Sequence, residues 1–158
     1  MESTDPEHYP VALILPLRGD YETAVKLLDE CFTQRSLHSS GAEYTLGQTG
    51  PHHVVLVTGL SKTSAADSVA SVVPDLLKEY PFIRAGFLVG VGAIAPSEGL
   101  AQAGDIVVGM PQDYESGLVQ FDADKARREK TLHTMGHWQK PPPFVGQAID
   151  DTLSTQGR

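Results

Sequence analysis

The sequence predicts an α/β protein built around one mixed β-sheet. Apolar runs of strand length alternate with longer segments in which apolar residues recur at helical spacing. Two of the apolar runs, 44–47 and 53–57, are separated by a short segment containing Gly50 and Pro51, which is typical of an antiparallel hairpin. Because both kinds of connection occur, we expect parallel and antiparallel strand pairs in the same sheet.

Length and composition describe one acidic domain. The chain has 158 residues, a formal net charge of -8 and a single cysteine. We expect a polar tail at 1–9 and one domain at 10–158. The acidic charge disfavours nucleic acid as a partner, and one cysteine fits a reducing compartment. No apolar run reaches the roughly 18 residues of a membrane span and the N-terminus is polar, so we expect a cytoplasmic protein.

The first strand and helix are predicted close to the N-terminus. Residues 11–15 form an apolar run that ends at Pro16. Asp20 follows a short turn and is well placed to cap a helix. That helix is expected to carry its apolar side chains at Ala24, Leu27, Leu28 and Cys31 or Phe32.

Two further helices and a short strand are predicted downstream. The second helix begins at Ser61 or Thr63 and contains Pro74, where we expect a kink or an early break. A short strand is expected at 117–121. The third helix, at 144–153, follows an extended Lys-Pro-Pro-Pro segment.

The centre of the chain combines a predicted buried strand with glycines, which have no side chain to cover the backbone. Residues 83–89 are mostly apolar, which is typical of a strand buried on both faces, and they lead into Gly90 and Gly92. Residues 104–110 predict a second apolar strand. In open α/β sheets, ligands bind beyond the carboxyl ends of the strands, where glycines expose backbone N–H groups. The alternative is two core strands joined by a glycine turn.

Asp20 is the acidic residue best placed for chemistry. If the first and central strands are parallel neighbours, Asp20 lies at the same sheet edge as Gly90. There its carboxylate can bind a ribose hydroxyl or act as a general base on water. The structural alternative is a simple helix cap. His133 and His137 lack an obvious third ligand, so no metal site is expected.

Several segments, in this order and spacing, resemble the nucleoside phosphorylase family, which includes the methylthioadenosine nucleosidases. The closest likeness is to the fungal form often joined to NACHT, ankyrin or tetratricopeptide modules. The segments are Leu15-Pro16-Leu17, Leu28-Asp29-Glu30, Tyr44-Thr45-Leu46-Gly47, His53-Val54-Val55-Leu56, Ser64-Ala65-Ala66, Tyr80-Pro81-Phe82-Ile83-Arg84-Ala85-Gly86, Val89-Gly90-Val91-Gly92, Gly104-Asp105-Ile106-Val107-Val108, Gly117-Leu118-Val119-Gln120-Phe121-Asp122 and Lys140-Pro141-Pro142.

The resemblance implies a three-layer αβα sandwich and cleavage of the N-glycosidic bond of a purine-type nucleoside. Phosphate or water is the acceptor, and no metal or organic cofactor is needed. The ribose and acceptor site falls on Gly90, Val91, Gly92 and Ala93. The family's catalytic acidic position falls on Asp20, and Gly19-Asp20 matches the Gly-Asp pair of the phosphorylases. The choice between phosphate and water stays open.

The resemblance also has departures. Phosphorylases commonly have Ser where this chain has Val91, and the Arg that follows their Gly-Asp pair is absent. The family's C-terminal ribose-binding Glu and catalytic Asp find no match, so we expect an N-terminal part of the domain with impaired catalysis. Missing strands leave an unpaired edge, which favours homo-oligomers. The alternative function is a non-catalytic ligand-sensing or self-association module of a NACHT or ankyrin-type receptor.

Overall fold

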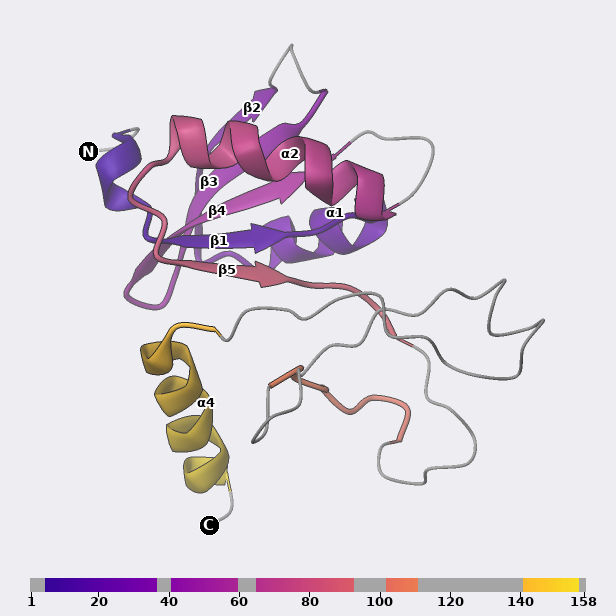
Figure 1. Cartoon of the computed structure of the whole chain (residues 1–158), viewed down its shortest axis with the longest axis vertical. Coiled ribbons are helices and arrows are strands. Elements are labelled where there is room, and N and C mark those ends of the chain that lie inside the picture. The colour runs from indigo at the N-terminus through magenta and orange to yellow at the C-terminus, as the bar shows by residue number, and fades with distance from the viewer. Residues whose placement is uncertain (1–4, 37–40, 60–64, 93–101, 111–140, 157–158) are drawn as a thin grey trace, which may run out of the picture. The chain divides into compact units, whose positions relative to one another are not determined.

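The computed structural model describes residues 5–36, 41–59, 65–92, 102–110 and 141–156. The chain divides into two compact units, Met1–Ala93 and Ile94–Arg158. The first unit contains the β-sheet with the helices that cover it, and the second contains the last helix (Figure 1). The strand expected at 117–121 lies outside the described residues.

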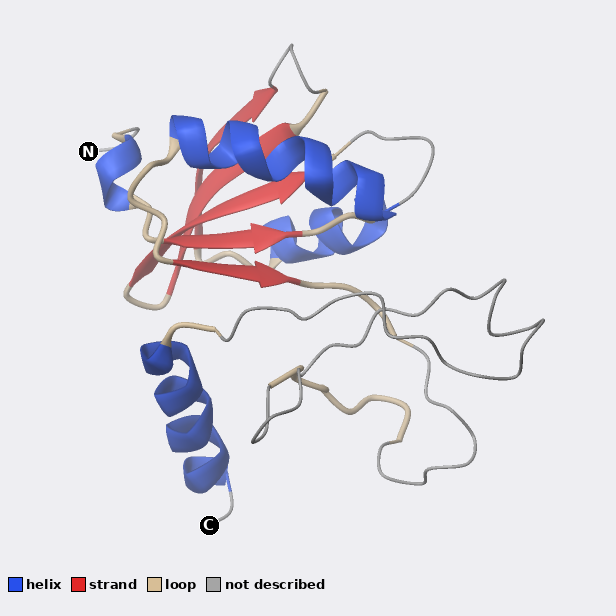
Figure 2. Ribbon diagram, viewed as in Figure 1, coloured by secondary structure: helices blue, strands red, loops and turns tan. Residues whose placement is uncertain are grey.

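The first unit is organised on a five-stranded mixed sheet with the order β2-β3-β4-β1-β5 (Figure 2). Strand β1 is parallel to both β4 and β5, whereas β3 is antiparallel to β2 and β4. The predicted mixed α/β sheet is therefore confirmed. The strands are β1 (Val11–Ile14), β2 (Glu30–Ser36), β3 (Glu43–Thr49), β4 (His52–Thr58) and β5 (Ala85–Leu88).

Helices cover both faces of this sheet. Alternate residues of a strand point to opposite faces, and β4 follows this rule: Val55 and Val57 pack in one core cluster, Val54 and Leu56 in another. The first cluster includes residues of α2 and the second residues of α1, so the unit has the three layers of an αβα sandwich (Figure 1). The helices are the 3-10 turn η1 (Pro6–His8), α1 (Arg18–Lys26), α2 (Ala65–Glu79) and α4 (Pro143–Gln156).

The first helix is shorter than the sequence predicts. It ends at Lys26, and the segment with Cys31 and Phe32 forms β2 instead. Local apolar spacing continues the helix, but β2 gains an antiparallel ladder with β3, from Glu30↔Gln48 to Ser36↔Glu43, with one register shift between Cys31 and Thr33. The expectation that Cys31 lies in the core is also wrong, because this side chain is exposed.

The central strand is less buried than predicted. In β5 only Ala85 is buried; Leu88 is 60% exposed, and Val91 beyond the strand is 84% exposed. Within the described residues β5 pairs with β1 alone, so it forms an edge of the sheet. The second apolar run, at 104–110, forms no strand, and Ile106 is 91% exposed. Among the described residues no strand pairs with this run, and a strand-forming sequence needs such a partner to become a strand.

Two local predictions on helices and turns are revised. Helix α2 continues through Pro74 to Glu79, so the predicted early break is wrong. Val72 and Leu76, on either side of Pro74, are buried, and this burial offsets the backbone hydrogen bond that proline cannot donate. The β3–β4 turn is tighter than expected, because Thr49 pairs directly with His52 and only two residues connect them. Gly50 has φ 54° there, a conformation that favours glycine.

The remaining predicted helix is present in the second unit. α4 begins at Pro143, the last proline of the predicted lead-in, and contains the predicted segment 144–153. Tyr9, at the junction of the predicted tail and domain, is fully buried against Tyr80. In the part of the chain that the structure describes, no helix is both long and apolar enough to cross a membrane.

Candidate functional site

The candidate site lies at the carboxyl edge of the parallel strands. β4, β1 and β5 run in the same direction, and Ile14 is paired with Val57 on one side and Leu88 on the other. Backbone pairing extends one residue further, because the N–H of Leu15 donates to the Val57 carbonyl at 2.8 Å and that of Val89 to the Ile14 carbonyl at 2.9 Å. Beyond these bonds the chain enters α1 after β1 and the glycine segment after β5.

Asp20 is part of helix α1 and not its cap. The N-cap residue is Leu17, which makes no side-chain capping bond, and Asp20 lies in the first helical turn. The predicted capping role is therefore wrong. A carboxylate in this turn is still favoured by the helix dipole, which places partial positive charge at the N-terminus.

The structure brings Asp20 and Gly90 together. A Cβ atom added to Gly90 would lie 3.8 Å from Oδ2 of Asp20. That oxygen is buried, and none of the described residues forms a hydrogen bond with it. Buried polar atoms in native proteins nearly always have a partner, so an oxygen like this one is a candidate for binding water or a ligand.

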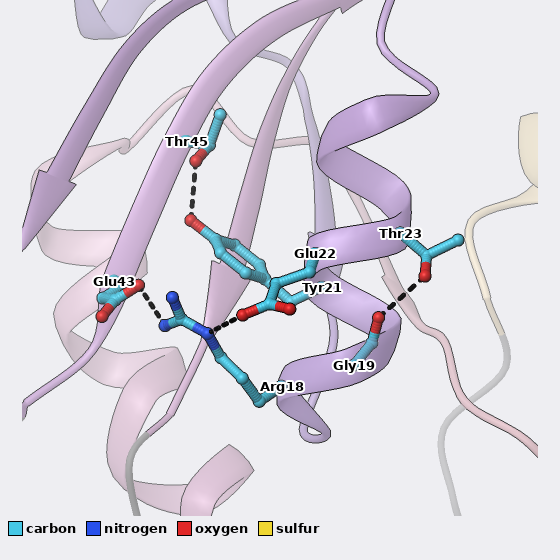
Figure 3. Close-up of polar contacts among 7 residues, drawn as sticks. All are labelled: Arg18, Gly19, Tyr21, Glu22, Thr23, Glu43 and Thr45. Atoms are coloured by element: carbon cyan, nitrogen blue, oxygen red, sulfur yellow. Dashed lines mark hydrogen bonds and ion pairs between the residues drawn. The ribbon is translucent and has the colours of Figure 1, made fainter.

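The other predicted site residues are close to Asp20 or Gly90 in the sequence, and those that the structure describes lie in open surroundings. Gly19 precedes Asp20 in α1, and its carbonyl accepts a hydrogen bond from the Thr23 hydroxyl at 2.9 Å (Figure 3). Added Cβ atoms at Gly19 and Gly92 would meet no atom within 4 Å. Val91 points into open space as an exposed side chain. Ala93 lies outside the described residues, so its predicted role has no structural counterpart here.

A polar cluster that sequence analysis missed joins α1 to β3. We call Arg18, Tyr21, Glu22, Glu43 and Thr45 the α1–β3 anchor (Figure 3). The Tyr21 hydroxyl and Thr45 Oγ1 are 2.6 Å apart in a buried hydrogen bond. Arg18 donates from Nε to Glu22 at 2.8 Å and from a terminal nitrogen to Glu43, and its guanidinium carbon lies 5.6 Å from the centre of the Tyr21 ring.

The anchor was only partly visible in the sequence. Arg18 and Glu22 are four residues apart, a spacing that predicts an ion pair on one helix face. The contacts to β3 join residues more than 20 positions apart, so no local pattern reveals them. The hydrogen bonds that Arg18 donates, first to Glu22 and then to Glu43, raise the pKa of Arg18, which keeps the guanidinium charged.

A shallow depression beside the anchor is lined by side chains of α1. It has a volume of about 210 Å³ and is bounded by Arg18, Tyr21, Glu22, Val25 and Lys26. Its lining does not include Asp20 or Gly90, so it is separate from the candidate site. In the described ranges, no group of three or more His, Cys, Asp or Glu side chains could hold a metal ion.

The fold and site define an α/β protein with a buried acidic oxygen, unbonded by any described residue, at the carboxyl edge of a mixed sheet. No family model matches the sequence. The chain is similar to a protein described as a nucleotide-binding leucine-rich repeat (NLR)-like protein from the fungus Hyaloscypha variabilis, with 27% identity over 157 residues. The match covers 98% of this chain but only 16% of that protein, so the chain spans about a sixth of its relative's length.

Proposed function

We propose that the chain is a ligand-sensing module of an NLR-like fungal protein and that its ligand is a nucleoside. The observation that carries the proposal is the match to an NLR-like protein across 98% of the chain, within 16% of the relative. Within that longer protein, we assign the recognition of a ligand to this module. The sheet edge at Asp20 supplies a place for a ligand.

The chemistry of the edge supports a nucleoside as the ligand. Ribose presents hydroxyl donors, and the buried Oδ2 of Asp20 is an acceptor without a bond from any described residue. A bond from a hydroxyl to a carboxylate is charge-assisted and stronger than a neutral one. Gly90 presents only its backbone to this oxygen, and a Cβ there would lie 3.8 Å from it.

Cleavage of the N-glycosidic bond is the second candidate function. It is favoured by the same carboxylate, because an unpaired Asp20 could activate an attacking water as a general base. Cleavage asks more of the site than binding does: besides a base, it needs an acceptor in place and stabilisation of the departing nucleobase. Binding needs only the acceptor oxygen and the open backbone.

The test is calorimetric titration of the purified chain with adenosine, inosine, uridine and methylthioadenosine, with and without phosphate. Base release is followed in parallel by chromatography. Saturable binding without release supports the sensing module. Release would replace it with an enzyme, and phosphate dependence would identify the acceptor. No binding to any of the four by a folded sample contradicts the proposal.

A matched pair of variants assigns the binding to the sheet edge. Asp20→Asn removes the negative charge at the edge, and we expect it to lower affinity at least tenfold. Asp29→Asn makes the same charge change beyond the other end of α1, where the side chain accepts a bond from the Gly50 N–H at 2.7 Å. An amide oxygen can still accept that bond, so this control should bind like the parent. Equal losses in both variants would place the ligand elsewhere.

A further inference from the structure

The residues on either side of Asp20 are both tied to strand β3. Tyr21 directly follows Asp20, is only 1% exposed and packs in the core cluster that contains Leu56. Its hydroxyl reaches Thr45 in the middle of β3 at 2.6 Å. Arg18, two residues before Asp20, reaches Glu43 on the same strand (Figure 3). The first turn of α1 is therefore held to the sheet by contacts that flank the carboxylate.

Helix α1 needs such contacts because its own N-terminus is weakly capped. Leu17 at the N-cap makes no side-chain hydrogen bond, whereas Ser, Thr, Asp or Asn in that position would stabilise the turn. The helix has nine residues, and isolated helices of this length are marginal in water. Without tertiary contacts, the first turn is the part of such a helix that frays.

The contacts of the anchor differ in strength. Arg18 is 48% exposed, and exposed ion pairs contribute little because water screens them. The bond between Tyr21 and Thr45 is buried, and Thr45 is fully inaccessible to solvent. Loss of either hydroxyl removes this bond from the core, which is costly. The Tyr21–Thr45 bond is thus the dominant element of the anchor.

We infer that Tyr21 and Thr45 are positioning residues, whose buried hydrogen bond holds the first turn of α1 so that the Asp20 carboxylate faces Gly90. The expected effect of this hydrogen bond on ligand affinity rests on the proposed nucleoside function. Its effect on the position of residue 20 does not, because the separation of residues 20 and 90 is measurable without a ligand. The experiment therefore has two independent arms.

The first arm measures proximity through a disulfide. Asp20→Cys and Gly90→Cys are combined with Cys31→Ser, and the effective concentration of the two thiols is obtained by equilibration with glutathione. Tyr21→Phe or Thr45→Val should lower this effective concentration at least fivefold. The double variant should lower it no further than either single variant, because both substitutions remove the same bond. Thr45→Ser keeps the hydroxyl and should restore the parent value.

A control variant separates positioning from general loss of stability. Val72→Ala destabilises the opposite face of the sheet, where Val72 of helix α2 is buried in the core, and should leave the effective concentration within twofold of the parent. An unchanged value in Tyr21→Phe and Thr45→Val would overturn the inference. So would an equal fall in Val72→Ala, or failure of the parent pair to form a disulfide.

The second arm titrates the same anchor variants, with Asp20 intact, against the nucleoside that binds the parent most tightly. Tyr21→Phe and Thr45→Val should each weaken binding at least fivefold, whereas Thr45→Ser and Val72→Ala should not. Unchanged affinity in the first two would overturn the inference. If the parent binds no nucleoside, the proposed function fails, and the disulfide arm alone decides whether Tyr21 and Thr45 position residue 20.

Discussion

Replacement of Asp20 by alanine should stabilise the protein while it removes ligand binding. The structure leaves Oδ2 of Asp20 buried and without a hydrogen bond from any described residue. Such a group lowers stability by roughly 1–3 kcal/mol relative to a solvated one. A residue that is unfavourable for the fold but well placed for a ligand is a common feature of functional sites.

The magnitude follows from three terms. Relief of the unpaired oxygen contributes about 1–3 kcal/mol, and alanine is about 0.5 kcal/mol better than aspartate inside a helix. Against these, Asp20 lies in the first turn of α1, where loss of its interaction with the helix dipole costs about 0.3–1 kcal/mol. The sum is a stabilisation of roughly 0.5–3 kcal/mol, which raises Tm by several degrees.

Urea unfolding monitored by circular dichroism measures this change, with an unchanged m-value as the check that the same transition is compared. Asp29→Ala is the matched control, since Asp29 accepts a hydrogen bond from the Gly50 N–H at 2.7 Å. We expect that variant to lose about 1 kcal/mol, the opposite sign. A destabilised Asp20→Ala would refute the argument, because it would show that the carboxylate has a structural partner in solution.

Three further predictions concern a tyrosine and two glycines. Desolvation raises the pKa of Tyr44, with smaller contributions from the nearby charges of Glu79 and Asp75, so the protein should lose stability as the pH rises above about 10. Tyr44→Phe should flatten this loss of stability in urea titrations at pH 8 to about 11. An unchanged slope of stability against pH would contradict the prediction. Gly47→Ala should destabilise β3 by roughly 1–3 kcal/mol or more, because the new Cβ would lie 2.6 Å from a backbone carbonyl oxygen; a wild-type Tm would show that β2 can move away. Gly92→Val should lower nucleoside affinity at least tenfold with little change in Tm, since no atom lies within 4 Å of the added Cβ; unchanged affinity in calorimetry would place the ligand elsewhere.

Stability falls as the pH rises because the folded and unfolded chains hold the Tyr44 proton with different affinity. The phenol of Tyr44 is fully buried, and its folded-state pKa lies above that of an unfolded tyrosine. The unfolded chain therefore releases this proton first as the pH rises, and unfolding becomes more favourable. The contribution is complete below the unfolded pKa, which is about 10, and disappears as the pH rises toward the folded value. Phenylalanine has no proton to lose, which is why the substitution isolates the effect.

The amino-acid sequence alone determined the class of fold and the proximity of Asp20 and Gly90 at one sheet edge. Apolar runs and turn residues predicted β1, β3, β4, α2 and α4, and the hairpin between β3 and β4 showed that the sheet is mixed. The order of Asp20 after the first strand and Gly90 after the central strand predicted that they share an edge. Such elements can be predicted because burial of one face of a helix or strand makes apolar residues recur at a regular spacing in the sequence.

Only the tertiary structure decided which segments pair and which side chains meet. Cys31 continues a helical pattern, yet its segment forms β2 because β3 offers it a hydrogen-bonded ladder. The run 104–110 has the composition of a strand and forms none in the described structure. The bond from Tyr21 to Thr45, and the approach of the Asp20 carboxylate to Gly90, join residues far apart in the chain. Such contacts depend on packing and on the satisfaction of buried polar groups, which are properties of the whole fold and not of any local stretch of sequence.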